Sequence, residues 1–182
     1  LTDIDDTLTR DGAIEPAALA ALRDLAAAGL PVIAVTGRGA GWSEPFARDW
    51  PLVAIVAENG AVMLRRSATG LQRDFVDPPA VRSDHARRLA ACARAIVEQV
   101  PGAALARDSG GRITDIAIDH GEYTQLSPAG IAAVVQLMRR HGLNATVSSI
   151  HVNGWIGSHS KWTGATWAVD VCCTRTLDPR RW

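Results

Sequence analysis

The chain opens with Leu1-Thr2-Asp3-Ile4-Asp5-Asp6-Thr7-Leu8, where two carboxylates lie two positions apart. We expect residues 1–5 to form the stub of a strand that brings Asp3 and Asp5 to the same side. Ligands of open α/β sheets bind beyond the carboxyl ends of the strands. Paired carboxylates there suit magnesium binding and covalent catalysis, with one attacking and the other moving a proton. A polar strand end that caps a turn would have the same composition.

Strands and helices alternate in the residues that follow. Glycine or turn signals separate an Ala/Leu-rich helical stretch from short apolar runs that are typical of buried strands. Asn59-Gly60 predicts a tight turn followed by a returning strand. This order predicts an α/β fold with a parallel sheet and right-handed crossovers. The expected helices span 15–28 and 42–50, and the expected strands span 31–36, 52–57 and 61–65.

A second polar group follows the second expected strand, in Val35-Thr36-Gly37-Arg38. A hydroxyl at a strand end, followed by glycine, can present Oγ and backbone N–H groups to phosphate oxygens. Thr36 and Gly37 are therefore candidate phosphate-binding residues, although an ordinary turn between strand and helix would look the same. Arg38 could contact a substrate or cap the next helix, and we take Asn59 as a further candidate for substrate contact.

The middle of the chain predicts a separate α+β lobe. The segment Val76-Asp77-Pro78-Pro79 predicts a linker. A long helix over 81–100 follows, then a half-exposed strand over 112–119 whose residues alternate with a period of two. Ser127-Pro128 begins another helix, and residues 145–156 form a strand pair or one bent strand. We therefore expect a core of 1–76 and 158–182, interrupted by a lobe of 77–157.

This lobe contains two polar candidates for substrate contact. Asp115 belongs to an acidic cluster with Asp119 and Glu122 that could meet a sugar or polyol, or could be the solvated face of a strand. His151 alternates with Asn153 just before the lobe ends, and could line a ligand cleft or pack at a hinge.

Lys161 follows the lobe, and we expect it to begin a helix in Ser158-His159-Ser160-Lys161-Trp162. A lysine here could lie over a phosphate and neutralise the charge that develops on it. A solvated surface lysine is the alternative.

Composition places the chain among globular proteins, with 47% hydrophobic and 21% charged residues in 182. Since 19 basic residues balance 19 acidic ones, we expect neither a nucleic-acid nor a membrane partner. The longest apolar runs are too short to span a bilayer. Cys92, Cys172 and Cys173 lack disulfide or metal-site spacing, which predicts reduced thiols in a cytoplasmic protein.

Taken in order, these groups resemble the haloacid dehalogenase (HAD) superfamily of phosphatases. The chain is similar to the subfamily with a large α+β cap inserted after the third core strand, such as sucrose-phosphate, mannosyl-phosphoglycerate and Cof-type phosphatases. The resemblance implies a Rossmann-like core with a cap that closes over the site. The residues that carry it are Asp3-Ile4-Asp5-Asp6-Thr7, Thr36-Gly37-Arg38, Glu58-Asn59-Gly60-Ala61 and Lys161.

The resemblance also implies a role for each residue. Asp3 would be the nucleophile that forms an aspartyl-phosphate, while Asp5 would protonate the leaving alcohol and then activate water. Thr36, Gly37 and Lys161 would hold the phosphoryl group. Mg²⁺ would bridge Asp3, the backbone carbonyl of Asp5 and the phosphate. The implied function is magnesium-dependent hydrolysis of a phosphorylated sugar or similar small phosphate ester; a phosphomutase and a non-catalytic binding protein are the alternatives.

The family pattern is not matched after Lys161. The family carries a Gly-Asp-x-x-x-Asp acidic cluster on a last core strand, and neither Asp170 nor Asp178 lies in such a cluster. We therefore expect that strand and its metal ligands to be missing from this chain, which also begins directly at the first motif. Fewer carboxylates would weaken magnesium binding, and a missing strand would leave an open sheet edge. A substitute role for Asp170 or Asp178 is the alternative.

Overall fold

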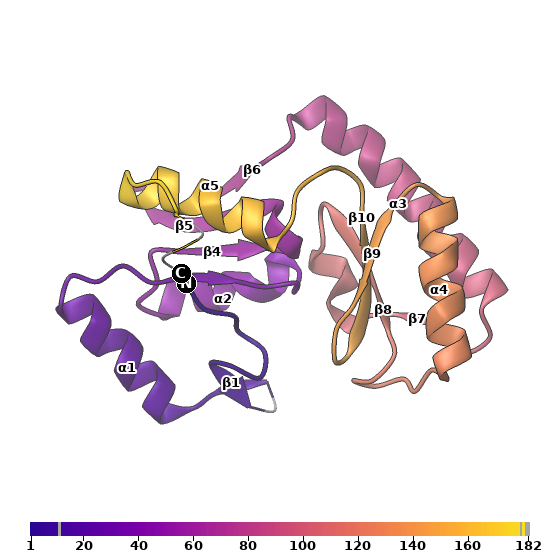
Figure 1. The fold of residues 1–182 in the computed structure, drawn as a ribbon, viewed down its shortest axis with the longest axis horizontal. Helices are drawn as coiled ribbons and strands as arrows, with labels where there is room; N and C mark the ends of the chain where they lie inside the picture. Colours follow the sequence, from indigo (N-terminus) through magenta and orange to yellow (C-terminus); the bar gives the residue numbers. More distant parts are fainter. Residues whose placement is uncertain (11, 179, 181–182) are drawn as a thin grey trace. The chain divides into compact units, whose positions relative to one another are not determined.

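The fold was analysed in a computed structural model that describes residues 1–10, 12–178 and 180. The chain divides into two compact units, which can be followed by colour in Figure 1. The first unit consists of Leu1–Val76 and His159–Trp182, and the second consists of Asp77–Ser158.

The first unit is built on a four-stranded sheet in the order β3-β4-β5-β6 (Figure 1). The first two strands are parallel, and each later pair is antiparallel. The N-terminal stub joins this sheet beside β3 through a parallel bridge between Thr2 and Ala34. The strands are β3 (Ile33–Val35), β4 (Ala54–Ala57), β5 (Val62–Ser67) and β6 (Gly70–Phe75).

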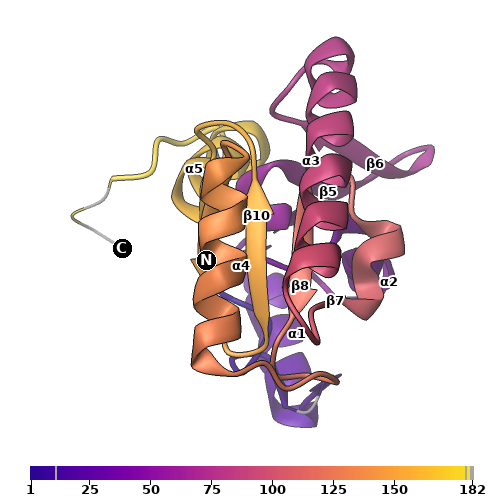
Figure 2. The same ribbon diagram turned by 90° about the vertical axis from the view of Figure 1, so that its right-hand side faces the viewer.

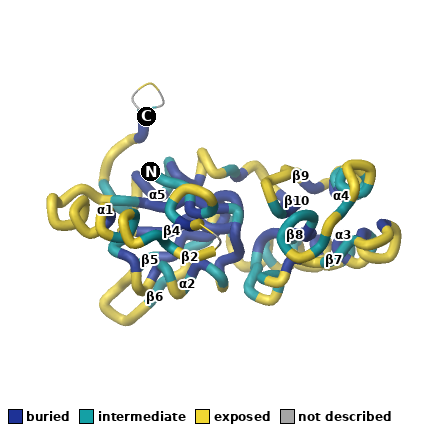
Figure 3. The backbone as a smooth tube through the Cα atoms, turned by 90° about the horizontal axis from the view of Figure 1, so that it is seen from below, coloured by how far each residue is buried: buried dark blue, intermediate teal, exposed yellow. Residues whose placement is uncertain are grey.

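Helix α5 packs on β3, β4 and β5, while α2 contacts β4, β5 and β6. The side of α5 that meets the sheet carries small residues, Ala165 and Ala168, which pack with Val56 and Met63. β3, β4 and the first half of β5 are buried as a result (Figure 3). The helices of this unit are α1 (Pro16–Ala27), α2 (Ala40–Asp49) and α5 (Lys161–Cys173), with a short 3-10 turn, η1 (Glu58–Gly60).

The α/β class is confirmed, with one refinement of the sheet. Its parallel part ends at β4, because η1 turns the chain back so that β5 returns antiparallel to β4. Three strands of the first unit were not predicted. These are the two strands of the hairpin, β1 (Thr9–Arg10) and β2 (Ala13–Ile14), and the edge strand β6. The mostly polar sequence of β6 is typical of a loop.

The second unit is an α+β lobe. Its antiparallel sheet has the order β7-β8-β10-β9, so residues 145–156 form the strand pair rather than one bent strand. Figure 2 shows α3 and α4 side by side over β8 and β10. The elements are α3 (Pro79–Gln99), β7 (Ala104–Leu105), η2 (Arg107–Gly111), β8 (Asp115–Asp119), α4 (Pro128–Arg140), β9 (Asn144–Val147) and β10 (His151–Trp155).

The core of the second unit lies between these two helices and the sheet. Leu89, Cys92 and Ile96 of α3 meet Val134 and Met138 of α4 there. Burial raises the pKa of the Cys92 thiol to about 11, so the thiol is protonated and unreactive at neutral pH. Helix α4 begins as expected, since Ser127 caps it by accepting a hydrogen bond from the backbone N–H of Gly130.

The strand expected to be half-exposed is buried instead, at Asp115 and from Ala117 to Asp119. Its carboxylates are compatible with burial because each has partners. Asp119, for example, accepts four backbone N–H bonds of 2.8–3.1 Å from the loop that follows it, residues 121–124. Burial alone would raise the pKa of Asp119, but these four bonds favour the ionised form and together lower it below the ordinary value of 3.8.

We expect Asp119→Asn to destabilise the second unit at pH 7 by about 1–3 kcal/mol, because an amide NH₂ cannot accept the bonds made by the second carboxylate oxygen. Since the folded pKa is lowered, the carboxylate stabilises the fold fully above pH 3.8 and loses that effect as pH falls through the folded pKa. Urea unfolding at pH 7 and pH 3 measures this. The deficit of Asp119→Asn should shrink at pH 3, and an equal deficit at both values would contradict the assignment. The matched control is Asp84→Asn, the same substitution at an exposed position of α3.

Candidate active site

The first motif forms a tight turn around one buried carbonyl. The backbone oxygen of Ile4 accepts bonds from the amides of Thr7, Leu8 and Thr9, at 3.3, 2.9 and 3.1 Å, and from the Thr9 hydroxyl at 3.0 Å. Asp6 lies in the left-handed region with φ 56°, which lets the chain reverse there. Because Ile4 is fully buried, the turn is anchored between Asp3 and Asp5.

Asp3 lies in direct contact with Lys161, 158 positions away in the chain. The lysine Nζ donates to Oδ2 of Asp3 at 2.8 Å, and Oδ1 accepts from the Ile4 amide at 2.9 Å. The side chains of Lys161 and Asp3 are 46% and 44% exposed, so a ligand can reach both. The pair therefore offers a carboxylate and a cation at one accessible point.

Lys161 is placed by the start of α5. Ser160 caps the helix by accepting the backbone N–H of Thr163, whose hydroxyl in turn accepts the Ser160 N–H. This reciprocal capping fixes the first turn of the helix. The free N–H groups of a helix start also favour anions, which adds to the charge of the lysine.

Two glycines allow α5 to approach η1 this closely. A Cβ on Gly60 would lie 2.1 Å from the backbone oxygen of Ser160, and a Cβ on Gly164 would lie 2.5 Å from Cα of Gly60. Neither distance is sterically possible. Gly60 also has φ 112°, a region that L side chains rarely adopt. This close packing sets the distance between η1 and the first turn of α5.

The carboxylate of Asp5 is bound by the guanidinium of Arg38. Nε of Arg38 lies 3.1 and 3.2 Å from the two carboxylate oxygens of Asp5, and Nη2 lies 3.0 Å from Oδ1. This is a bidentate charge-assisted contact, which fixes orientation as well as distance. Arg38 was expected to contact substrate or cap a helix. Its guanidinium binds the carboxylate of Asp5, and a contact between Arg38 and a substrate stays a prediction.

The loop that carries Arg38 is tied to η1 by several backbone bonds. Thr36 is fully buried, and its Oγ1 accepts the amide of Arg38 at 3.0 Å. The Thr36 carbonyl accepts the amide of Asn59 at 3.2 Å, and the Arg38 carbonyl accepts that of Glu58 at 3.0 Å. Gly37 lies between the two tied residues. Thr36 and Gly37 thus belong to a braced loop, and the Asn59 amide supports that loop.

Glu58 belongs to the Glu58-Asn59-Gly60-Ala61 motif, but no role was predicted for it. Its side chain is a fully buried carboxylate of this unit. Its Oε1 accepts the amide of Ala40, the first residue of α2, at 2.9 Å. A carboxylate at a helix start satisfies a free N–H group and suits the helix dipole. The left-handed φ values of Glu58 and Asn59, 50° and 56°, aim it inward. The sequence feature that could have indicated a role for Glu58 is its position directly before the predicted turn at Asn59-Gly60.

The two remaining candidates lie in the second unit. Asp115 has a fully buried side chain and accepts 2.8 and 2.9 Å bonds from Arg112, which also binds Asp108. The carboxylate of Asp115 is thus held in an ion pair with Arg112, and a contact between Asp115 and a substrate stays a prediction. His151 is buried, with Nε2 3.1 Å from Oε2 of Glu122.

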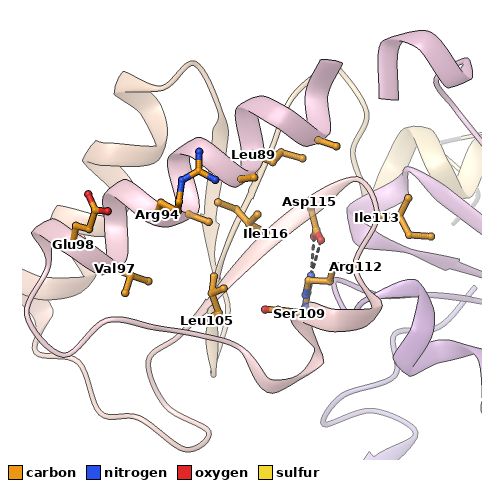
Figure 4. Close-up of a pocket in the computed structure, with 13 residues that line it drawn as sticks. Leu89, Arg94, Val97, Glu98, Leu105, Ser109, Arg112, Ile113, Asp115 and Ile116 are labelled. Atoms are coloured by element: carbon orange, nitrogen blue, oxygen red, sulfur yellow. Dashed lines mark hydrogen bonds and ion pairs between the residues drawn. The ribbon is translucent and has the colours of Figure 1, made fainter. Parts of the chain in front are cut away.

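Asp115 borders a pocket of about 550 Å³ that lies wholly within the second unit (Figure 4). One wall is α3, and the other is the segment from Leu105 to Ile116. In Figure 4 the dashed lines join Asp115 to Arg112 along this second wall. The lining is mainly apolar, and it includes the exposed side chains of Val97 and Leu105.

No group of three or more His, Cys, Asp or Glu side chains that could hold a metal occurs among residues 1–10, 12–178 and 180. Asp170 lies on an exposed part of α5, and Asp178 accepts the backbone N–H of Arg180. The first motif itself carries three carboxylates, those of Asp3, Asp5 and Asp6, as possible oxygen ligands. Among residues 1–10, 12–178 and 180, no helix has the length and apolar character required to cross a membrane.

Comparison with known proteins identifies the family pattern in the N-terminal part. Residues 1–81 match the family model of haloacid dehalogenase-like hydrolases. No match was found among curated proteins. The match supports the resemblance expected from the motifs over residues 1–81, and the family it describes is one of hydrolases.

Solved structures share the fold of nearly the whole chain. A Thermoplasma acidophilum protein has a TM-score of 0.71 at 14% identity, over 93% of this chain and 69% of its own. The sucrose-phosphatase of Synechocystis, solved with sucrose and phosphate, has 0.63 at 14%, over 94% and 69%. The C-terminal domain of trehalose-6-phosphate phosphatase from C. albicans has 0.62 at 12%, over 88% and 57%. The chain thus spans between about half and two thirds of these structures.

Proposed function

From the match of residues 1–81 to the haloacid dehalogenase-like hydrolases, we propose that this chain is a magnesium-dependent phosphomonoester hydrolase that works through an aspartyl-phosphate. The observation that carries the proposal is the contact of Lys161 with Asp3, because it places a cation beside a reachable carboxylate. Phosphoryl transfer requires positioning and charge neutralisation above all. The contact supplies both at one point.

In the proposed reaction, a carboxylate oxygen of Asp3 attacks phosphorus and the ester oxygen leaves. Asp5 gives its proton to that leaving oxygen, and then accepts a proton from the water that attacks the aspartyl-phosphate. Lys161 neutralises charge on the phosphoryl oxygens, while Thr36 and Gly37 contribute a hydroxyl and a backbone N–H. Hydrolysis releases inorganic phosphate and returns Asp3 to a carboxylate.

Mg²⁺ would be held by the carboxylate of Asp3 and the backbone carbonyl of Asp5. These hard oxygens fit the ion in kind, since Mg²⁺ binds through one or two carboxylates together with phosphate oxygens and keeps several waters. When bound, the ion would draw negative charge from the phosphoryl oxygens. The carboxylate of Asp5 is left for proton transfer.

We propose a phosphorylated sugar, or a similar small polyol phosphate, as the substrate. The sugar phosphatases named above support this class through their shared fold. The unit Asp77–Ser158 is the proposed cap, in which His151 remains a candidate substrate contact. The free thiols of Cys92, Cys172 and Cys173 support the proposed cytoplasmic location.

Release of inorganic phosphate tests the proposal directly. The chain is incubated with p-nitrophenyl phosphate, sucrose phosphate or trehalose 6-phosphate, with magnesium or with EDTA. We expect phosphate release that depends on magnesium and is faster with a sugar phosphate. Isomerised sugar phosphate without free phosphate would indicate a phosphomutase. Absence of turnover with all three esters at millimolar concentration would reject the proposed hydrolase.

A further inference from the structure

We propose that Arg38, supported by the indole of Trp42, is a positioning residue that holds the carboxyl group of Asp5 in place, so that its protonated form can give a proton to the leaving oxygen. This inference rests on the proposed function. It assigns Arg38 to the acid–base step rather than to the binding of phosphate, and it adds Trp42 to the residues on which catalysis depends.

The first support is the geometry of the ion pair. Arg38 meets Asp5 with Nε and Nη2, so one edge of the planar guanidinium faces the carboxylate. The Arg38 side chain is 9% exposed and that of Asp5 is 29% exposed, so the cation is withdrawn from water while the carboxylate is still reachable. A bidentate contact of this kind fixes the plane of the carboxylate, which a single lysine nitrogen cannot do.

The second support is the surface on which Arg38 rests. Cζ of Arg38 lies 4.8 Å from the centroid of the Trp42 ring, within cation–π range. Trp42 lies in the first turn of α2 and continues into an aromatic row. Its ring is 4.6 Å from that of Phe46, which is 4.5 Å from that of buried Trp50. The guanidinium is thus packed between a braced aromatic face and Asp5.

The third support is the fixed backbone of Arg38. Its amide donates to Oγ1 of Thr36, and its carbonyl accepts the amide of Glu58. Backbone, ring face and carboxylate together restrict the side chain to one arrangement. An acid displaced by about 1 Å from its productive position can cost roughly 100-fold in rate. Restriction of Asp5 therefore affects the step in which Asp5 acts.

The test uses esters that differ in their need for an acid. The leaving group of p-nitrophenyl phosphate departs as a stable phenolate, whereas that of glycerol 2-phosphate must be protonated. The ratio of the two kcat/KM values isolates the first phosphoryl transfer, because kcat/KM excludes the later hydrolysis of the aspartyl-phosphate. We expect Arg38→Lys and Trp42→Leu each to lower kcat/KM for glycerol 2-phosphate by roughly 10-fold or more, with a much smaller loss for p-nitrophenyl phosphate.

Two further variants separate positioning from folding. Trp42→Phe keeps an aromatic face and should restore most of the ratio that Trp42→Leu loses. Arg48→Lys replaces an exposed arginine of the helix that carries Trp42. Arg48 pairs with Glu44 at 3.2 Å, and its replacement should leave the ratio unchanged. Circular dichroism and thermal unfolding monitor the fold of each variant.

Three results would overturn the inference. An equal loss for both esters would place Arg38 on the phosphate instead. Unchanged kcat/KM in a folded Arg38→Lys would remove its role altogether. If the unaltered chain hydrolyses neither ester, the proposed function itself fails, and the positioning role fails with it.

Discussion

Replacement of Asp3 by Asn is expected to lower phosphate release on the order of 10⁴-fold or more, the scale at which removal of a catalytic nucleophile acts. An amide nitrogen has no lone pair available to attack phosphorus, and the amide oxygen is a far weaker nucleophile than a carboxylate. The fold should survive the change, because Asp3 is 44% exposed and an Asn oxygen can still accept the Ile4 amide. Inorganic phosphate released from p-nitrophenyl phosphate in the presence of magnesium measures the effect.

A trapping experiment identifies the attacking atom itself. Rapid acid quenching of the unaltered chain during turnover should leave one phosphoryl group on a peptide that contains Asp3, detectable by mass spectrometry and labile to hydroxylamine. Asp3→Asn should leave none. Asp24→Asn, the same substitution on exposed α1, should behave as the unaltered chain. Normal turnover by Asp3→Asn would rule out the aspartyl-phosphate route.

The elements predicted correctly are those in which local sequence and tertiary packing agree. The apolar run at Ile33–Val35 is buried in the sheet, and the helix expected over 81–100 is α3, with Leu89 and Ile96 in the core. The missed strand β6 shows the limit of this reasoning. Its residues pair with only one neighbour, β5, and its polar side chains carry no apolar alternation that would distinguish a strand from a loop.

The candidate residues of the first unit were identified by chemistry and order rather than by structure. Asp3 and Lys161 could be expected to meet because the family order implies it, and they do so at 2.8 Å. The partner of Arg38 could not be read from the sequence, since an arginine after Thr-Gly has several carboxylates within reach. Which one it meets depends on where the Ile4 turn places Asp5. The role of Glu58 was missed for a similar reason: the sequence does not show that Glu58 and Asn59 both adopt left-handed φ values or that the Glu58 carboxylate binds the Ala40 amide.

Replacement of Gly60 by Ala is expected to lower the free energy of unfolding by roughly 2–6 kcal/mol, which combines overpacking and a disfavoured φ at one position. The added Cβ would lie 2.1 Å from the backbone oxygen of Ser160, so relief requires the first turn of α5 to move. Lys161 begins that turn and would leave Asp3. We therefore expect loss of activity together with loss of stability, measured by urea unfolding and phosphate release.

Gly70→Ala separates the two causes. Gly70 has φ 123°, close to the 112° of Gly60, but no atom lies within 4 Å of its added Cβ. Its expected cost is the backbone strain alone, about 1–3 kcal/mol, with activity retained. If the two variants lose equal stability and Gly60→Ala stays active, the close approach of η1 and α5 does not position Lys161. A larger loss in Gly60→Ala, accompanied by inactivity, would show that the absence of a side chain at Gly60 controls where Lys161 lies.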